Sequence, residues 1–464
     1  MNSTSSTTID DKSKLHVVMF PWLAIGHLIP FLELSKCLAS KGHHVSFIST
    51  PRNIQRLPKI PQNLSPFINL VNLPFPQVEN LPKNAQSSTD IPMKKTQLLK
   101  RAFDGLQVDL ATFLENSKIP IDWIIYDFAS HWLPEIANRL NIPCVYFCLF
   151  TAATLCFYGP PYALLSSKEA RLTPESFTIV PNWIPFPSDI VYRLHEILPN
   201  FEGFPDNISC ISDVTGDVPD TYRFGVVIRD CDFIALRSCV ELEPEWISFL
   251  SELNKKTGYF SWSGWTTRDE SVVYVALGTE AVLSQNQSNE LALGLERSEL
   301  PFFWVLRAPP ESYVDMLTTL PNGFEEKVKN RGMVWTSWAP QVNILAHRSV
   351  GGFLTHCGWN SLIEGLGYGR VPVLLPMLND QGLNARLLVG KKLGLEIPRN
   401  EQDGSFTSES VAELLRLVMV EKEGEVLRCN ARKMKGVFCD ENVMGGYMDV
   451  FIGYLQAHKR QHGP

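Results

Sequence analysis

Residues 338–381 read WAPQVNILAHRSVGGFLTHCGWNSLIEGLGYGRVPVLLPMLNDQ, and this stretch decides the fold class of the chain. With the residues just before it, it contains three short apolar runs, GMVWTS (332–337), GGFLTH (351–356) and VPVLLP (371–376). Such runs are typical of buried parallel strands separated by helices. Each run ends in polar or aromatic residues, and ligands of open α/β sheets bind where the carboxyl ends of strands meet the following loops. The stretch therefore predicts an α/β fold with one ligand site built from three loops.

The chemistry of these loops suits a uridine diphosphate sugar. Trp338 offers a flat face on which a uracil can stack. Gly358 permits a tight turn, and a helix that begins near Asn360 presents free backbone N–H groups and a positive dipole end to a pyrophosphate. We expect further donors from the His356 ring and from the Asn360 and Ser361 side chains.

Acidic and amide groups complete the predicted donor site. Glu364, one helical turn beyond the helix start, can accept from both ribose hydroxyls, which leaves Asp380 and Gln381 for the hydroxyls of the sugar. Each residue alone says little, because a single histidine such as His356 is more often a core residue than a phosphate ligand. The spacing of the whole set carries the prediction.

That spacing resembles the signature box of plant UDP-dependent glycosyltransferases of small molecules, and the match runs through 338–381 without gaps. In this family the box binds the donor, and a terminal Gln generally accompanies UDP-glucose. The resemblance covers nearly the whole chain and implies the GT-B architecture, in which two Rossmann-like domains with parallel sheets face a central cleft. The donor-binding residues that we predict are Thr279, Trp338, Ala339, Gln341, His356, Gly358, Trp359, Asn360, Ser361, Glu364, Asp380 and Gln381.

Composition excludes several other classes. The formal net charge is −7 and the pI is near 5.9, so no basic stripe is available for nucleic acid. The most apolar stretch (144–162) is shorter than a membrane span needs, and the polar amino terminus lacks the apolar core of a secretion signal. Ten cysteines without a CxxC pair indicate reduced thiols and a cytoplasmic protein.

A histidine occupies the first turn of the chain, where the strand LHVVMF (15–20) leads into a helix. His27 lies at the start of that helix, which disfavours the imidazolium and helps keep the ring neutral. The residue is a candidate general base, although a histidine that merely satisfies a helix end would look the same. Asp127 follows another buried strand and can orient the ring if the two strands are neighbours. The resemblance implies that His27 and Asp127 are the catalytic pair.

The segments 50–120 and 150–225 are rich in Pro, Asn and Ser and contain scattered aromatic residues. Loops of this kind on the face that carries His27 would line a pocket for the acceptor, although most of the aromatic residues are expected in the core. The predicted acceptor contacts are Trp22, Ile25, Trp132, Phe150, Phe157 and Phe201.

The predicted domain boundaries follow from this arrangement. We expect a disordered tail (1–14), an acceptor-binding domain (15–254), a linker (255–270), a UDP-sugar-binding domain (271–444) and a final helix (445–464) that packs back on the first domain. Family members usually have a longer, acidic linker with a Trp-Leu-Asp element. A short linker can restrict domain closure, so a sugar-nucleotide binder without turnover stays open as an alternative.

Two further classes of site are disfavoured. The first turn lacks GxGxxG, which argues against a nicotinamide oxidoreductase. The triplet Asp230-Cys231-Asp232 has the DxD pattern that ligates a metal in other glycosyltransferases, but here it only enters a strand. We therefore predict no metal and no cofactor, with the UDP-sugar as a co-substrate.

The sequence as a whole predicts a monomeric, metal-independent, inverting UDP-glycosyltransferase. The expected donor is UDP-glucose, with UDP-rhamnose, UDP-xylose or UDP-galactose as alternatives. The expected acceptor is a hydroxyl of a hydrophobic small molecule or its glycoside, because FPWLAIGHLIPFLELSK, STPRNIQRLP and VVYVALGTEA look most like a branch that glycosylates existing glycosides.

Overall fold

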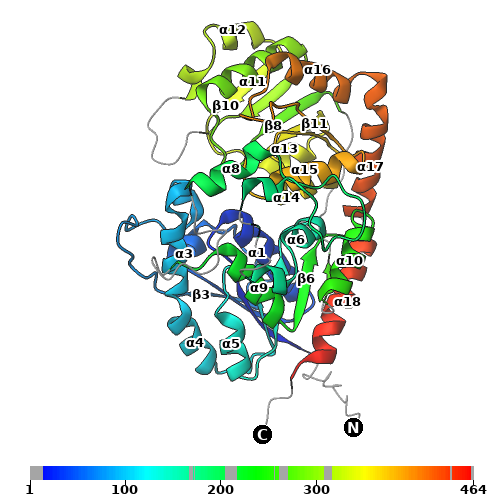
Figure 1. The fold of residues 1–464 in the computed structure, drawn as a ribbon. Coiled ribbons are helices and arrows are strands. Elements are labelled where there is room, and N and C mark those ends of the chain that lie inside the picture. The colour runs from blue at the N-terminus through cyan, green and yellow to red at the C-terminus, as the bar shows by residue number, and fades with distance from the viewer. Residues whose placement is uncertain are drawn as a thin grey trace, which may run out of the picture.

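The computed structural model describes residues 14–166, 171, 173–203, 217–254, 257–260, 270–307, 316–438 and 441–460. The predicted tail apart from Lys14, and most of the predicted linker, lie outside these residues. Within them the chain forms two parallel sheets with helices on their faces, one sheet above the other along the long axis of the molecule (Figure 1). The predicted α/β class with two Rossmann-like domains is confirmed.

The first sheet has seven strands in the order β3-β2-β1-β4-β5-β6-β7. Its strands are β1 (His16–Phe20), β2 (His44–Ser49), β3 (Ile68–Asn72), β4 (Trp123–Tyr126), β5 (Cys144–Cys148), β6 (Phe233–Arg237) and β7 (Thr257–Phe260). β1 and β4 pair in parallel, with Val18 opposite Ile124, as the predicted contact between His27 and Asp127 requires. β7 corrects the predicted linker, because residues 257–260 belong to this sheet.

The helices of the N-terminal domain alternate with these strands. They are α1 (Ile25–Ser40), α2 (Pro51–Arg56), α3 (Thr96–Asp104), α4 (Gln107–Glu115), α5 (Leu133–Arg139), α6 (Ala152–Tyr158), α7 (Pro161–Leu164), α8 (Leu194–Gly203), α9 (Asp220–Asp230) and α10 (Pro244–Asn254), with short 3-10 helices η2 (Ser88–Asp90), η3 (Met93–Lys95) and η4 (Pro174–Phe177). Pro30 is the sixth residue of α1 and cannot donate to the Gly26 carbonyl one turn earlier, and Nδ2 of Asn360 donates to that carbonyl instead.

The second sheet has six strands in the order β10-β9-β8-β11-β12-β13. Its strands are β8 (Val272–Ala276), β9 (Phe302–Val305), β10 (Gly332–Trp335), β11 (Val350–Thr355), β12 (Val371–Leu374) and β13 (Leu395–Glu396). Its helices are α11 (Gln285–Ser298), α12 (Phe324–Val328), α13 (Gln341–Ala346), α14 (Trp359–Gly367), α15 (Gln381–Gly390), α16 (Ser408–Met419) and α17 (Glu425–Phe438), with η6 (Met316–Thr319) and η7 (Lys422–Gly424). The three apolar runs of the opening stretch are β10, β11 and β12.

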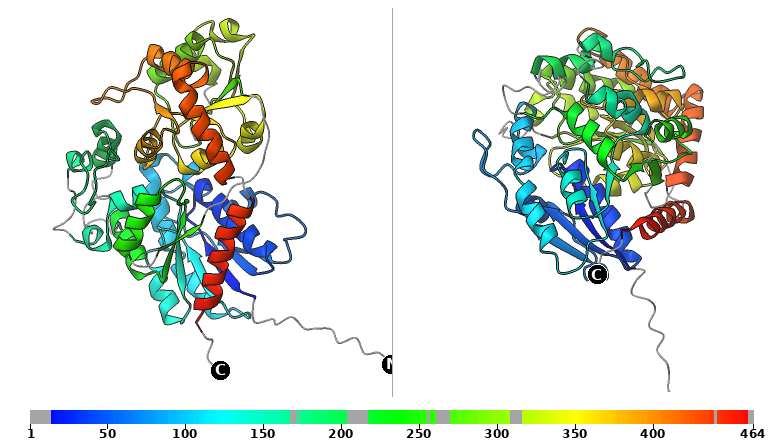
Figure 2. Two further views of the ribbon diagram at one scale, coloured as in Figure 1. Left: turned by 90° about the vertical axis from the view of Figure 1, so that its right-hand side faces the viewer. Right: turned by 60° about the horizontal axis from the view of Figure 1, so that its bottom comes forward.

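The last helix, α18 (Glu441–His458), lies along the first sheet (Figure 2). The indole N–H of Trp123 on β4 donates to the Leu455 carbonyl at 2.8 Å. The Tyr454 ring stacks on Phe233 of β6 with centroids 4.2 Å apart. Apolar burial and this hydrogen bond thus hold the C-terminal end of the chain on the N-terminal domain.

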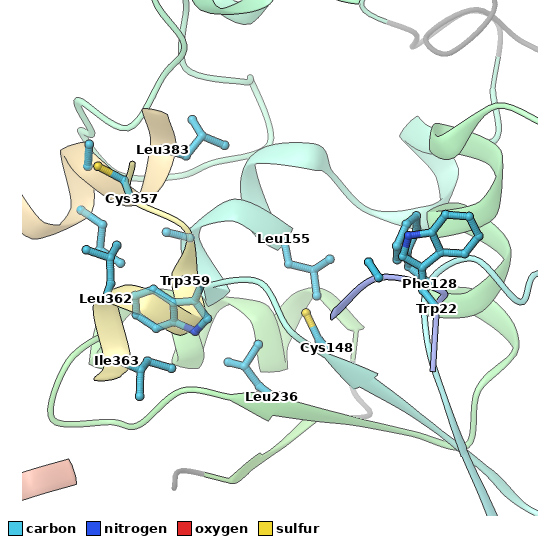
Figure 3. Close-up of a cluster of buried hydrophobic side chains, with 14 of the residues drawn as sticks. Trp22, Phe128, Cys148, Leu155, Leu236, Cys357, Trp359, Leu362, Ile363 and Leu383 are labelled. Carbon is cyan, nitrogen blue, oxygen red and sulfur yellow. The ribbon is translucent and has the colours of Figure 1, made fainter. Parts of the chain in front are cut away.

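The central strands β1, β4 and β5 of the first sheet are buried on both faces. Along β1, Val18 and Phe20 belong to one core cluster while Val17 and Met19 belong to another, as the alternation of a strand requires. The larger cluster continues into the C-terminal domain, and Figure 3 shows residues from both domains within it. Among the described residues, no helix is long and apolar enough to cross a membrane.

Candidate active site

A cleft of about 2740 Å³ lies between the two domains, where the carboxyl ends of strands from both sheets meet it. The β1–α1 turn and the loops after β4 and β5 line one side, and the loops after β8, β10, β11 and β12 line the other. We call these two sides the acceptor wall and the donor wall. Side chains that are far apart in the sequence therefore face one another across a single space.

The predicted catalytic pair meets in the acceptor wall. Nδ1 of His27 lies 2.7 Å from Oδ2 of Asp127, and the carboxylate is completely buried. Backbone N–H groups of Trp22 and Phe128 also donate to this carboxylate, at 3.1 and 2.7 Å. These bonds fix the carboxylate, so His27 holds its proton on Nδ1 and leaves Nε2 as the acceptor. The parallel pairing of β1 and β4 produces the contact.

The electrostatics of His27 correct one expectation. Burial alone would lower the pKa of His27, but the Asp127 carboxylate outweighs it, and Glu280 and Asp380 of the donor wall add to the effect. The pKa of His27 is therefore raised above its usual value of 6.5, although the helix start was expected to keep the ring neutral. A raised pKa makes the neutral ring a stronger base.

His356 sits in a tight turn between β11 and α14. A Cβ on Gly278 or on Gly358 would lie 2.6 Å from Nε2 of His356, so both glycines give the ring its room. Gly278 also needs its positive φ of 76°. Burial lowers the pKa of His356 to about 4, so the ring is neutral at pH 7. Cys357 continues the turn with a φ of 68°, which is uncommon for a residue with a side chain.

The first helical turns of α14 are joined to α13 by side-chain hydrogen bonds. Nε2 of Gln341 donates to Oγ of Ser361 at 3.1 Å and to Oε2 of Glu364 at 2.8 Å. Burial raises the pKa of Glu364. All three residues line the cleft, so the predicted ribose-binding carboxylate is held in place before any ligand arrives.

Asn360 does not point its amide freely at the cleft. Its Nδ2 donates to the Gly26 carbonyl at 2.5 Å, and its Oδ1 accepts from Arg237 at the end of β6. In this arrangement the Asn360 side chain joins the two domains, and the second hydrogen of its Nδ2 is the part left for the predicted donation to a pyrophosphate. The backbone at the start of α14 remains at the cleft, since Gly358 and Ser361 line it.

The loop after β12 places Asp380 and Gln381 in the cleft wall. Burial raises the pKa of Asp380 to about 6, and Nδ2 of Asn384 donates to its Oδ2 at 2.7 Å. Oε1 of Gln381 accepts from the backbone N–H groups of Met377 and Leu378, at 2.9 and 2.8 Å. The Gln381 carbonyl is thus occupied, and its NH₂ group is the part left for a ligand.

The remaining predicted donor residues also line the cleft. Trp338 is 72% exposed, and an exposed indole face is available for stacking. Thr279 and Ala339 also line the cleft. Next to Thr279, Oε1 of Glu280 accepts from Oγ of Ser88 at 2.6 Å, which is a second polar contact between the domains.

Three of the predicted acceptor contacts, Trp22, Ile25 and Phe150, line the cleft. Two others lie in the core instead. Trp132 packs on Phe20 and Phe103 and donates to Asp104, while Phe157 is fully buried behind the wall. The side chain of Phe201 lies outside the described residues.

Sequence reasoning missed several residues of the acceptor wall. Phe128, Tyr158, Tyr192 and Phe224 line the cleft, and Phe224 stacks on Phe128 with centroids 4.9 Å apart. Phe128 follows Asp127 directly, so the strand-end rule could have found it. Tyr192 lies in an irregular segment, and nothing in the sequence marks it.

The DxD triplet lies away from the cleft. Asp230 pairs with Arg229 at 2.7 Å, and Asp232 binds the Cys144 backbone N–H at 2.8 Å and Arg460 at 3.0 Å. These bonds give both carboxylates structural roles.

Comparison with known proteins places the chain in a family. Residues 237–458 match the family model described as UDP-glucoronosyl and UDP-glucosyl transferase. UDP-glycosyltransferase 91C1 of Arabidopsis thaliana is 51% identical over an alignment of 466 residues, which covers 96% of this chain and 97% of that protein. Soyasaponin III rhamnosyltransferase of Glycine max is 40% identical over 484 residues, 99% of each chain.

Solved structures agree on the fold. The crystal structure of Glycyrrhiza uralensis UGT73P12 complexed with glycyrrhetinic acid 3-O-monoglucuronide superposes with a TM-score of 0.75 at 22% identity, covering 96% of both chains. The fold, with its cleft between two parallel sheets, defines a GT-B enzyme. The chain belongs to the UDP-glycosyltransferase family and is a UDP-glycosyltransferase of plant secondary metabolism.

Proposed function

We propose that the protein transfers glucose from UDP-glucose to a hydroxyl of a hydrophobic small molecule or of its glycoside, with inversion at the anomeric carbon. The observation that carries this proposal is the 2.7 Å contact between His27 and Asp127, set in the wall opposite the turn that holds His356 and Gly358. A base on one side of the cleft and a diphosphate site on the other are the two parts that a single displacement needs.

In this mechanism, Nε2 of His27 removes the proton from the acceptor hydroxyl. The hydroxyl oxygen attacks the anomeric carbon of the α-linked sugar while the bond from that carbon to the diphosphate oxygen breaks on the opposite face. The proton stays on His27, and Asp127 stabilises the imidazolium. Attack from the opposite face gives a β-glucoside.

The leaving UDP carries the negative charge that develops in the transition state. The start of α14 offers backbone N–H groups and the positive end of its dipole, and the Thr279 hydroxyl and the neutral His356 ring add donors. We propose that these groups suffice without a metal ion.

The donor sugar is proposed from the loop after β12. The NH₂ group of Gln381 can donate to one hydroxyl while the carboxylate of Asp380 accepts from its neighbour, an arrangement that suits adjacent equatorial hydroxyls such as those at C3 and C4 of glucose. UDP-rhamnose is the second candidate, because a relative at 40% identity is named as a rhamnosyltransferase.

Aromatic rings dominate the acceptor wall, which supports a hydrophobic acceptor. Phe128, Phe150, Tyr158 and Phe224 form one continuous set of ring contacts beside His27. We propose a cytoplasmic monomer, consistent with the free thiols of the described cysteines.

The test is transfer itself. The protein is incubated with UDP-glucose, UDP-rhamnose, UDP-galactose and UDP-xylose in turn, each with a set of plant aglycones and their glycosides. The masses of the products are measured by mass spectrometry. We expect a hexose added from UDP-glucose. Transfer from UDP-rhamnose alone would replace the donor assignment, and binding of UDP without transfer from any donor would leave only a sugar-nucleotide binder.

A further inference from the structure

Arg171 stands in the acceptor wall, between α7 and η4, with its guanidinium among aromatic rings. The guanidinium carbon lies 4.4 Å from the centroid of Phe157, 4.2 Å from that of Phe177 and 5.4 Å from that of Trp183. Rings at these distances attract a cation through their faces and hold the planar group in one orientation. They supply no acceptor for its N–H groups.

Only part of this guanidinium is hydrogen-bonded within the described residues. Its Nη2 donates to the carbonyls of Phe157 at 2.5 Å and of Tyr158 at 3.4 Å, whereas Nη1 is buried and has no partner there. Burial lowers the pKa of Arg171 to about 10, so the group is charged at neutral pH. Burying a charged donor that has no hydrogen-bond partner costs free energy, unless a ligand in the cleft accepts its hydrogen bond.

The other cations of the acceptor wall differ in this respect. Lys100 pairs with Asp220 at 2.7 Å, Arg56 pairs with Asp90 at 2.5 Å, and Arg237 donates to Asn360. No described carboxylate forms an ion pair with Arg171. Among the cations that line the cleft, Arg171 is the one whose side chain has a buried nitrogen without a hydrogen-bond partner among the described residues.

A row of rings connects Arg171 with the catalytic base. The Phe150 ring lies 6.3 Å from His27 and 6.2 Å from Tyr158, and the hydroxyl of Tyr158 lies 3.4 Å from that of Tyr192. Arg171 binds the Tyr158 carbonyl and lies at the far end of this row. An acceptor that lies along the rings with a hydroxyl at His27 would bring its other end toward Arg171.

We propose that Arg171 is a specificity-determining residue that binds a carboxylate carried by the acceptor, at the end remote from the hydroxyl that receives the sugar. One cation suits one negative charge, and a carboxylate is planar like the guanidinium and can accept its N–H groups directly. A doubly charged phosphate would need a second free cation, and the neighbouring cations are paired. The inference rests on the proposed function for the position of the reacting hydroxyl.

Binding is measured without turnover, so that a failure of the proposed transfer does not decide the result. The probes are two matched pairs, oleanolic acid with its methyl ester and 4-hydroxycinnamic acid with its methyl ester, titrated by quenching of tryptophan fluorescence. In at least one pair the wild type should bind the acid about tenfold to a hundredfold more tightly than the ester, because the ester lacks the charge. Arg171→Gln should remove this preference, and Arg171→Lys should retain part of it.

Two controls separate recognition from structure. Lys100→Met removes a cation of the same wall that is already paired, so the ratio of acid to ester affinity should not change. UDP affinity should be unchanged in Arg171→Gln if the fold is intact. Equal weakening of acid and ester in Arg171→Gln would give Arg171 a packing role alone and overturn the proposal. Absence of an acid preference in both pairs, including no binding of any probe, would also overturn it.

Discussion

The two walls of the cleft are built in different ways. In the donor wall, polar side chains hold one another: Gln341 binds Ser361 and Glu364, and Asn384 binds Asp380. In the acceptor wall, rings pack on rings beside the hydrogen-bonded pair of His27 and Asp127. A wall fixed by hydrogen bonds suits one ligand, here a nucleotide sugar. A wall of rings accepts many apolar shapes and selects among them by few polar contacts.

The walls are also coupled. Asn360 of the donor wall binds the carbonyl of Gly26, which directly precedes the proposed base His27, and Glu280 binds Ser88. Glu280 and Asp380 help raise the pKa of His27 across the cleft. Donor and acceptor chemistry should therefore separate in binding experiments but not completely in pH profiles.

The substitution with the largest expected effect distinguishes the role of the acceptor wall from that of the donor wall. His27→Ala should lower kcat by about 10² to 10⁴, because a general base is lost. UDP affinity should stay nearly unchanged, since His27 belongs to the acceptor wall. Calorimetry with UDP checks the second part. An equal loss of UDP affinity would move His27 into the donor site.

Asp127→Asn should slow turnover less than His27→Ala does. It should also shift the pH profile of kcat/KM. The carboxylate stabilises the imidazolium and raises the pKa of His27, and the neutral ring is the active form. Without that charge the pKa falls, so the acid limb of kcat/KM should shift to lower pH. The measurement is kcat/KM from pH 5 to 9 for both proteins. An unshifted limb with unaltered turnover would remove Asp127 from the mechanism.

Gln381 tests how the donor wall selects the sugar. UDP-glucose should exceed UDP-galactose in kcat/KM by about tenfold to a hundredfold, because inversion at C4 leaves a buried polar group unpaired. Gln381→His should narrow this ratio. Competition assays with both donors measure it. A higher kcat/KM for UDP-galactose in the wild type would exclude the glucose assignment.

Gly278→Ala tests the packing of the donor turn. Its Cβ would meet His356 at 2.6 Å, and overpacking of this kind costs about 1 to 3 kcal/mol, so UDP affinity should fall about tenfold. Gly323→Ala is the matched control, because Gly323 has a similar φ of 74° and a Cβ there would meet nothing within 4 Å. Equal effects of the two substitutions on UDP affinity would show that backbone strain, and not His356, is responsible.

The smallest expected effect is that of chelation. Activity should survive EDTA, because the start of α14 and nearby side chains are proposed to bind the diphosphate. Initial rates with and without EDTA are the measurement, with added Mn²⁺ as the control. Loss with EDTA and recovery with Mn²⁺ would contradict a metal-independent mechanism.

The donor wall could be read from the sequence because its residues follow three consecutive strands. Strand ends bring Trp338, His356 and Gln381 to one edge, so a local pattern predicts a spatial site. What the sequence did not show is which groups are already occupied. The carbonyl of Gln381 and the amide of Asn360 are both used by protein partners, and such bonds depend on tertiary packing.

The acceptor wall was harder to predict, because the position of its side chains also depends on tertiary packing. Trp132 and Phe157 are aromatic, as expected for residues of a pocket, yet their side chains lie in the core. Tyr192, in contrast, lines the cleft from an irregular segment. An aromatic residue in a loop can turn either way, and only packing decides. His27 and Asp127 were predictable because two neighbouring parallel strands end beside each other.

The configuration of the product tests the central claim most directly, because it reports whether a base opposite the diphosphate site performs one displacement. The product formed from UDP-α-D-glucose is purified, and its anomeric proton coupling is measured by NMR. We expect the wild type to form a β-glucoside and His27→Ala to lose this activity. An α-glucoside, or undiminished β-glucoside formation by His27→Ala, would contradict the central claim.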